Sequence, residues 1–184
     1  MEYNKILIEI AKTVILDSLS NTNKFNREFY LKSYPQLMEK RASFVTLNKN
    51  NKLRGCIGSL IPHQPLIDDI IHNAKAAAFQ DPRFKAVNKD EFNEVELEIS
   101  LLTYPKKLEY TDENDLKNKI KTGIDGVILK HSIYRATFLP QVWEDLPTFE
   151  LFFKYLCEKS GMTSQCLDSH PDIEIYQVEK IMQE

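Results

Sequence analysis

The segment LRGCIG, residues 53–58, has the residue types and spacing with the clearest chemical potential. Strand alternation places Arg54, Cys56 and Gly58 on one face, with Arg54 and Cys56 about 6.6 Å apart. A cation at that range favours the thiolate form of a cysteine, which is the reactive form. Cys56 is therefore a candidate nucleophile or redox thiol, with Arg54 as its partner. The alternative is that Cys56 is a small buried apolar residue, the more common role of a free cysteine.

Glycine is scarce in this chain, and two of its five glycines, Gly55 and Gly58, lie in the same segment. Glycine weakens the interior of a strand and is found there at bulges or where a ligand or another backbone approaches closely. Both glycines are therefore candidate binding residues. We expect that no side chain fits at Gly58.

The segment DPRF, residues 81–84, is the second candidate. Pro82 ends the preceding helix and holds Arg83 on a rigid turn. A rigidly placed guanidinium suits a clamp for a carboxylate or a phosphate group. Alternatively, Arg83 and Asp81 tie this loop to neighbouring carbonyl groups, and the sequence leaves both interpretations open.

Other candidates come from two proline loops and one strand. His63 and Gln141 each follow a proline in loops of similar sequence, and the only tryptophan, Trp143, lies close to Gln141. This combination suits a small-molecule pocket, although Trp143 can equally anchor its loop to the next helix. Glu98 lies on the polar face of an alternating strand, where it is a candidate general base if that face lines a cleft. Otherwise Glu98 faces water.

Metal-binding and nucleotide-binding motifs are absent from the sequence. His72 has helical spacing with Asp68 and Asp69, but such a group is more often a surface salt-bridge face than a metal site. The chain contains no HExxH, CxxC or three-histidine spacing and no glycine-rich phosphate loop. We therefore predict no metal site, and the sequence identifies no cofactor.

The spacing of apolar residues predicts the elements that must position these candidates. A helix is expected over 5–19 with Asn4 as its N-cap, followed by a long connection with a short helical piece. A hairpin around an asparagine-rich turn, a helix and an alternating strand come next, at 44–60, 65–79 and 95–101. The second half repeats this order, with strands at 126–131 and 134–139, a helix at 148–160 and a strand at 173–178.

The repeated order predicts an internal duplication. Because no flexible linker separates the halves, we expect them to share one sheet and one core. The expected organisation is a single domain of 1–184, with a helical lead-in at 1–43, a first repeat at 44–103 and a second repeat at 126–182.

Composition restricts the partners and the compartment. The net charge of −3 and the pI of about 5.9 argue against a nucleic-acid partner. No stretch approaches the roughly 18 apolar residues of a membrane span, and the N-terminus does not have the pattern of a secretory signal. Three widely spaced cysteines, Cys56, Cys157 and Cys166, are expected to be free thiols in a reducing compartment. These features predict a cytoplasmic protein without a membrane or nucleic-acid partner.

Beyond residue 43 the chain resembles the AMMECR family, named from a chromosomal region linked to Alport syndrome, intellectual disability, midface hypoplasia and elliptocytosis. The matching stretches, in family order, are FVTLNKNNKLRGCIGSLIPHQPL (44–66), AAAFQDPRF (76–84), ELEISLLT (96–103), GIDGVILK (123–130) and TFLPQVWEDLP (137–147). The family often has glycine where this chain has Ala42 and Ala136, which affects strand entry and leaves the candidate site unchanged. The resemblance implies a two-lobed α+β fold with internal duplication. We therefore expect two hairpin–helix–strand repeats in one mixed, barrel-like sheet with flanking helices.

The resemblance implies less about activity, because the family has no settled biochemical function. Its prokaryotic members are often encoded beside a Memo-like metalloprotein and a radical S-adenosylmethionine protein, which implies a shared modification or redox pathway. The first hypothesis is an enzyme or enzyme subunit in which Cys56 reacts. Arg54 and Arg83 would hold a small anionic molecule, and the polar candidates would assist. The second hypothesis is a non-catalytic module that binds a protein or a small ligand, in which Cys56 is inert.

Overall fold

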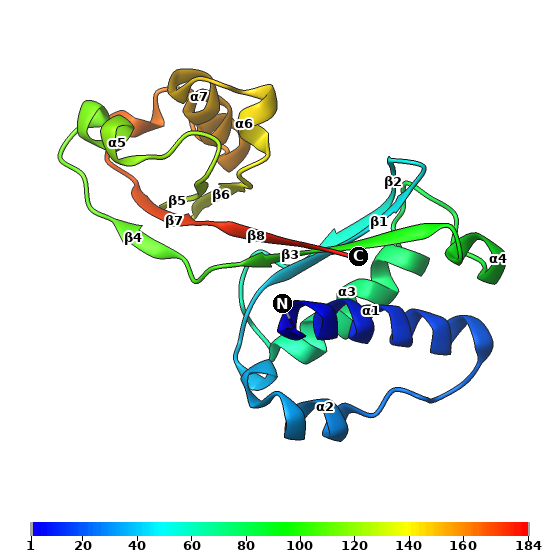
Figure 1. Ribbon diagram of the computed structural model, residues 1–184. Coiled ribbons are helices and arrows are strands. Elements are labelled where there is room, and N and C mark those ends of the chain that lie inside the picture. The colour runs from blue at the N-terminus through cyan, green and yellow to red at the C-terminus, as the bar shows by residue number, and fades with distance from the viewer. Residues whose placement is uncertain (1, 184) are drawn as a thin grey trace. The chain divides into compact units, whose positions relative to one another are not determined.

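A computed structural model describes residues 2–183 of the protein, which form two compact units (Figure 1). Within the described residues, unit 1 comprises 2–102 and 179–183, and unit 2 is Thr103–Val178. The chain therefore enters unit 2 once and returns to unit 1 for its last strand. Among the described residues, no helix is both long and apolar enough to cross a membrane.

Unit 1 is built on a four-stranded sheet in the order β2-β1-β3-β8. Its strands are β1 (Ser43–Lys49), β2 (Lys52–Gly58), β3 (Val95–Leu102) and β8 (Val178–Met182). β1 pairs antiparallel with both β2 and β3. The predicted asparagine turn between β1 and β2 is confirmed, because Asn50 and Asn51 have φ angles of 52° and 57°, a conformation that asparagine tolerates.

Two long helices supply most of the apolar surface that covers this sheet. α1 (Glu2–Ser20) and α3 (Leu66–Phe79) pack against each other, and α3 contacts β1 and β2 (Figure 1). The expected N-cap Asn4 is wrong, since Asn4 lies inside α1. The predicted short helical piece corresponds to α2 and a 3-10 turn, η1, and a further short helix precedes β3: α2 (Arg27–Ser33), η1 (Pro35–Met38) and α4 (Lys89–Phe92).

Close packing explains both glycines of the LRGCIG segment. A Cβ atom at Gly55 would overlap the carbonyl oxygen of Ala77 in α3. Gly55 therefore faces α3, and alternation directs Cys56 and Gly58 to the face turned away from α3, called the outer face below. A Cβ atom at Gly58 would overlap the Phe44 ring and lie 2.6 Å from the Ser43 carbonyl oxygen. Contacts within the chain thus require glycine at both positions.

Unit 2 has its own sheet, in the order β4-β7-β5-β6, and its own apolar core. Its strands are β4 (Lys106–Leu108), β5 (Gly126–His131), β6 (Tyr134–Phe138) and β7 (Asp172–Tyr176). Its helices are α5 (Glu113–Lys119), α6 (Val142–Asp145), α7 (Phe149–Ser160) and the 3-10 turn η2 (Cys166–Ser169). The predicted buried face of α7 is confirmed at Phe149, Phe152, Phe153 and Leu156, and Gly161 ends the helix with φ of 90°.

The expected single mixed, barrel-like sheet with one core is wrong. The described residues form two sheets with separate cores, and every pairing between their strands with a defined register is antiparallel. After β3 the chain leaves the unit 1 sheet, and β4 belongs to the unit 2 sheet. Each unit therefore has its own sheet, which its own helices cover. The order hairpin, helix, strand does occur in both units, as β2-β1-β3 with α3 and β6-β5-β7 with α7. Descent from an internal duplication stays a prediction.

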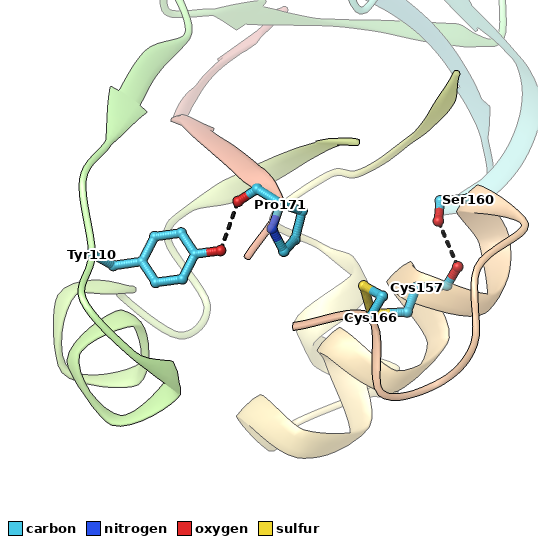
Figure 2. Close-up of a disulfide and its surroundings, with 5 residues drawn as sticks. All are labelled: Tyr110, Cys157, Ser160, Cys166 and Pro171. Carbon is cyan, nitrogen blue, oxygen red and sulfur yellow. Dashed lines mark hydrogen bonds between the residues drawn. A yellow bond between two sulfur atoms is a disulfide. The ribbon is translucent and has the colours of Figure 1, made fainter. Parts of the chain in front are cut away.

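The expectation of three free thiols is wrong for two of the cysteines. Cys157 and Cys166 form a disulfide with a Cα–Cα distance of 5.6 Å, shown in Figure 2. The turn at Gly161 reverses the chain after α7 and returns η2 to the last turn of that helix. Ser160 donates a hydrogen bond to the Cys157 carbonyl oxygen, and both cysteines are buried. Two cysteines nine residues apart can pair here because the chain reverses its direction at Gly161.

We expect Gly58→Val to lower the free energy of unfolding of unit 1 by more than about 2 kcal/mol, because the Phe44 ring and β1 must move. Chemical denaturation followed by circular dichroism measures this loss. Lys52→Val, at an exposed position of β2, serves as the control and should change stability by less than about 0.5 kcal/mol. Equal stability of the two variants would show that the outer face accepts a side chain at residue 58.

Loss of the disulfide should destabilise unit 2 by about 2–3 kcal/mol, since the closed loop is short. The fluorescence of Trp143, which lies in the unit 2 core, reports this unfolding. We expect Cys166→Ala to unfold at lower denaturant concentration, whereas Cys56→Ala should leave the Trp143 transition unchanged. If the Trp143 transition of Cys166→Ala equals that of the unsubstituted protein, the disulfide contributes nothing to stability.

Candidate functional site

Three side chains form a row across the outer face of the unit 1 sheet. Cys56 of β2 lies opposite Thr46 of β1, and Thr46 lies opposite Glu98 of β3. Directly opposite residues on one face have Cβ atoms about 4.5–5.5 Å apart. All three residues are partly exposed. The row therefore places a thiol, a hydroxyl and a carboxyl group in sequence on one accessible surface.

The backbone of Cys56 is paired with side chains and not with a neighbouring strand. β2 is an edge strand, and the Cys56 N–H donates to Asp81 Oδ2 at 2.9 Å while the Cys56 carbonyl accepts from Arg83 Nη2 at 3.1 Å. Both backbone groups therefore point away from β1, which makes Cys56 and Thr46 a closely spaced, non-hydrogen-bonded pair. The short separation lets Thr46 Oγ1 donate a hydrogen bond to Cys56 Sγ at 3.2 Å.

Asp81 and Arg83 form a clasp on this edge. Asp81 Oδ1 accepts from Arg83 Nε at 3.0 Å and Asp81 Oδ2 from Arg83 Nη2 at 2.7 Å. The Arg83 guanidinium, followed by the Cys56 N–H, outweighs the effect of burial and holds the pKa of Asp81 well below its usual range. Arg83 remains 53% exposed, and its Nη1 makes no hydrogen bond within residues 2–183. The clasp thus ties the loop to the Cys56 carbonyl group, which is the role that the sequence left open as the alternative to an anion clamp. Arg83 Nη1 is the donor that the clasp does not use.

Arg54 is engaged away from Cys56. Leu47 pairs with Gly55 and Asn48 with Leu53, so Arg54 is an extra residue in the ladder, a bulge of the kind that glycine indicates. Its Nε and Nη2 donate to the two carboxylate oxygens of Glu91 at 2.6 Å and 3.0 Å, which lowers the pKa of Glu91.

A second bond from Arg54 Nη2 reaches the Lys85 carbonyl at 2.7 Å, and Arg54 Nη1 is buried without a partner in the described residues. The guanidinium groups of Arg54 and Arg83 both lie over the Phe84 ring, at 5.7 Å and 5.5 Å from its centroid. These contacts hold the loop that carries the clasp against the edge of β2. The unpartnered donor of Arg54 is buried, so Arg83, and not Arg54, is the exposed cation beside Cys56.

The remaining sequence candidates are not members of this row. His63 is exposed in the loop after β2, with Nδ1 3.1 Å from the Ile61 carbonyl oxygen. Gln141 is exposed and precedes α6 in unit 2. Trp143 is buried in unit 2, where it stacks on Phe152 and donates to the Asp125 carbonyl at 2.8 Å. These contacts are those of the packing anchor that the sequence left as an alternative for Trp143.

Thr46 and Asp69 are the important residues that sequence reasoning missed. Asp69 is not part of a surface face with His72, because its side chain is fully buried and Asp68 pairs with Arg27 instead. Asp69 accepts five hydrogen bonds, from Ser43 N, Ser43 Oγ, Ser59 Oγ, Gln64 Nε2 and Asn73 Nδ2. Its position among the apolar residues of α3 was a usable signal. The signal for Thr46 was its place opposite Cys56 in the predicted hairpin.

Metal ligands do not gather at this site. In the part of the chain that the structure describes, no group of three or more His, Cys, Asp or Glu side chains can hold a metal ion. The chemistry available from the described residues is therefore that of a thiol with a hydroxyl donor, a nearby carboxyl group and a fixed guanidinium.

The chain is similar to known proteins along nearly its whole length. The family description AMMECR1 matches residues 8–181. A protein of Methanothermobacter thermautotrophicus is 34% identical over 94% of this chain and 88% of its own, and one of Thermococcus gammatolerans is 36% identical over 95% and 86%. Among solved structures, the uncharacterized protein PH0010 from Pyrococcus horikoshii has a TM-score of 0.79 and 33% identity, covering 100% of this chain and 92% of its own.

The lowered pKa of Asp81 predicts that unit 1 loses stability in acid. Because its pKa is lower in the folded than in the unfolded protein, its contribution is complete above about pH 4 and is lost as the pH falls below that value. We expect the Asp81→Asn variant to have a free energy of unfolding about 2 kcal/mol lower at pH 7. Between about pH 5 and pH 2 this free energy should change less than in the unsubstituted protein. Denaturation at several pH values measures both effects. Asp90→Asn, at an exposed position of α4, should keep the acid sensitivity of the unsubstituted protein.

Proposed function

We propose that this chain, which belongs to the AMMECR1 family, acts as an enzyme or enzyme subunit through thiol chemistry at Cys56. The observation that carries the proposal is the Thr46 hydroxyl hydrogen bond to Cys56 Sγ on a partly exposed surface. That bond holds the sulfur in one position on a surface that a reagent can reach. A cysteine that serves only as a small apolar residue has no need of such a donor.

The fixed environment of Cys56 supports the same proposal. The clasp of Asp81 and Arg83 holds both backbone groups of Cys56, so the sulfur has a defined position relative to the outer face. Glu98, next in the row after Thr46, is the general base of the proposal. Precise placement of a nucleophile by groups that do not react is a common feature of reactive sites.

Arg83 is the binding group of the proposal, and its ligand is a small anionic molecule. The clasp leaves only Nη1 of the guanidinium group available to a ligand. Arg83 can therefore bind an anion through this one nitrogen and not in a bidentate way. The ligand of an enzyme subunit can also be a group on a protein, and the proposed partners are the Memo-like and radical S-adenosylmethionine proteins of the family's gene neighbourhood. A cytoplasmic location remains part of this proposal, in which the buried disulfide is shielded from reductants by the fold.

The second candidate function is a non-catalytic module that binds a protein or a small ligand. One observation favours it: packing within unit 1 accounts for both glycines of the LRGCIG segment, so neither requires a ligand or a reaction. In a module of this kind Cys56 would react no faster in the folded protein than in the unfolded chain. The reactivity of Cys56 therefore distinguishes the two functions.

The test is the rate of alkylation of Cys56 at pH 7, followed by peptide mass spectrometry. We expect Cys56 of the folded protein to react with iodoacetamide faster than the same cysteine in the chain unfolded by urea. The disulfide is kept intact in both samples, so Cys56 is the reacting thiol. Equal or slower reaction in the folded protein contradicts thiol chemistry and supports the binding module.

Charge selectivity tests the role of Arg83 with the same assay. Iodoacetate is an anion and iodoacetamide is neutral, so a cation beside Cys56 raises the ratio of their rates. We expect Arg83→Gln to lower this ratio about threefold, which corresponds to about 0.6 kcal/mol, within the range of an exposed ion pair. Lys52→Gln removes an exposed cation from the same strand and should leave the ratio unchanged. An unchanged ratio in Arg83→Gln would remove Arg83 as the anion-binding group.

A further inference from the structure

We propose that the free edge of β6 in unit 2 binds an extended, acidic segment of a partner protein. The segment lies beside β6 as a further strand of the unit 2 sheet, a mode of recognition known as β-augmentation. β6 is the last strand in the order β4-β7-β5-β6, so its outward side has no neighbouring strand among the described residues. The inference concerns unit 2 alone and does not depend on the chemistry of Cys56.

The hairpin turn before β6 determines which of its backbone groups point outward. A two-residue loop joins β5 to β6 and begins at Ser132, whose φ of 54° is typical of the primed turns of hairpins. Such a loop closes on a hydrogen-bonded pair, here His131 and Tyr134, and non-hydrogen-bonded pairs then alternate with hydrogen-bonded ones. Arg135 and Thr137 belong to the non-hydrogen-bonded pairs. Their backbone N–H and C=O groups therefore point away from β5.

One contact agrees with this orientation and also shows that the edge of β6 stays open. Lys159 Nζ of α7 donates to the Thr137 carbonyl oxygen at 2.9 Å, so that carbonyl group faces outward. The Thr137 N–H and both backbone groups of Arg135 make no hydrogen bond outside the ladder within residues 2–183. At the edge of β2, by contrast, the clasp holds both backbone groups of Cys56. The outward groups of β6 that Lys159 does not occupy are available to a partner strand.

The charges on this edge select an acidic segment. Arg135 is exposed, and among the described residues neither Arg135 nor Lys159 forms an ion pair, whereas Lys130 of β5 is paired with Glu174. The whole protein has a net charge of −3, so composition alone does not explain two uncompensated cations on one edge. Charged side chains on an edge keep unsuitable strands away. Cations of one sign repel a basic strand, and also the same edge of a second copy, and they attract an acidic strand.

α7 adds an apolar contact surface beside the edge. Leu151, Tyr155 and Lys159 are spaced four residues apart, so they lie along one side of α7. The bond from Lys159 to β6 places this side of the helix next to the β6 edge. The side chains of Leu151 and Tyr155 are 41% and 43% exposed, and Tyr134 at the start of β6 is 39% exposed. Alternate side chains of a docked strand point to one face. The edge therefore suits a segment in which apolar and acidic residues alternate.

The test uses a blocked, fluorescein-labelled peptide of alternating valine and glutamate residues with the intact protein. We expect saturable binding by fluorescence anisotropy, together with slower amide hydrogen exchange at Arg135 and Thr137, because both N–H groups become hydrogen-bonded. A peptide with lysine in place of glutamate should bind about tenfold more weakly or worse, since it loses two ion pairs. An acidic peptide that is N-methylated at alternate residues should also lose binding, because it cannot complete the hydrogen-bond ladder.

Variants of the protein separate the charge of the edge from its backbone. Arg135→Gln and Lys159→Gln should each weaken binding about threefold, within the range of an exposed ion pair. Lys106→Gln removes an exposed cation from β4, at the opposite edge of the same sheet, and should leave binding unchanged. Arg135→Pro also removes an outward N–H group, which an edge strand tolerates, and should weaken binding more than Arg135→Gln. Trp143 fluorescence verifies that unit 2 is folded, and the N-methylated peptide makes the same comparison if Arg135→Pro is not.

Several outcomes overturn the proposal. Equal binding of the N-methylated peptide shows a purely ionic contact, and equal binding of the lysine peptide removes the preference for an acidic partner. Displacement of the peptide by single-stranded DNA assigns the surface to nucleic acid. Slow exchange at Arg135 without peptide, dependent on protein concentration, assigns the edge to a second copy of the chain. Absence of peptide binding up to about 1 mM, a very weak affinity, also overturns it. None of these results affects the proposed thiol function, which the alkylation of Cys56 tests separately.

Discussion

The carboxylate of Asp69 is the interaction on which unit 1 depends. It is fully buried, and its hydrogen bonds come from the start of β1, the loop after β2 and α3 itself. No cation pairs with it among the described residues, so neutral donors alone compensate the loss of water. Because these donors belong to three different segments, the carboxylate fixes α3 relative to the hairpin. That placement brings the Ala77 carbonyl against Gly55 and turns Cys56 to the outer face.

The clasp of Asp81 and Arg83 solves a second problem, which is the exposed edge of β2. An unpaired edge strand presents backbone donors and acceptors that can pair with another chain. Here a carboxylate takes the position of a neighbouring carbonyl, and a guanidinium takes the position of a neighbouring N–H group. The edge is blocked at Cys56 without a further strand, and the loop that blocks it carries a half-exposed cation to the side of the thiol.

Periodicity in the sequence was sufficient to predict the hairpin, the main helices and the buried face of α7, because those features depend on residues near one another. It identified the LRGCIG segment but not the reason for its glycines, which is the approach of α3 and of Phe44. Partners distant in sequence were missed. Arg54 binds Glu91, and Asp69 accepts hydrogen bonds from Ser43. Cys157 forms a disulfide with Cys166 across a turn. A pattern assigns a residue to a face, whereas the choice of partner depends on how separate elements pack.

The path of the chain has a consequence for synthesis on the ribosome. Thr103–Val178 forms unit 2, yet β8, which follows it, belongs beside β3 in the sheet of unit 1. The edge of β3 that later pairs with β8 therefore stays unpaired while all of unit 2 is translated. At about 5–20 residues per second this takes several seconds. Unit 2 has every one of its strands before unit 1 does. The nascent chain thus completes its internal unit first, and the sheet that carries Cys56 gains β8 only after all of unit 2 has been made.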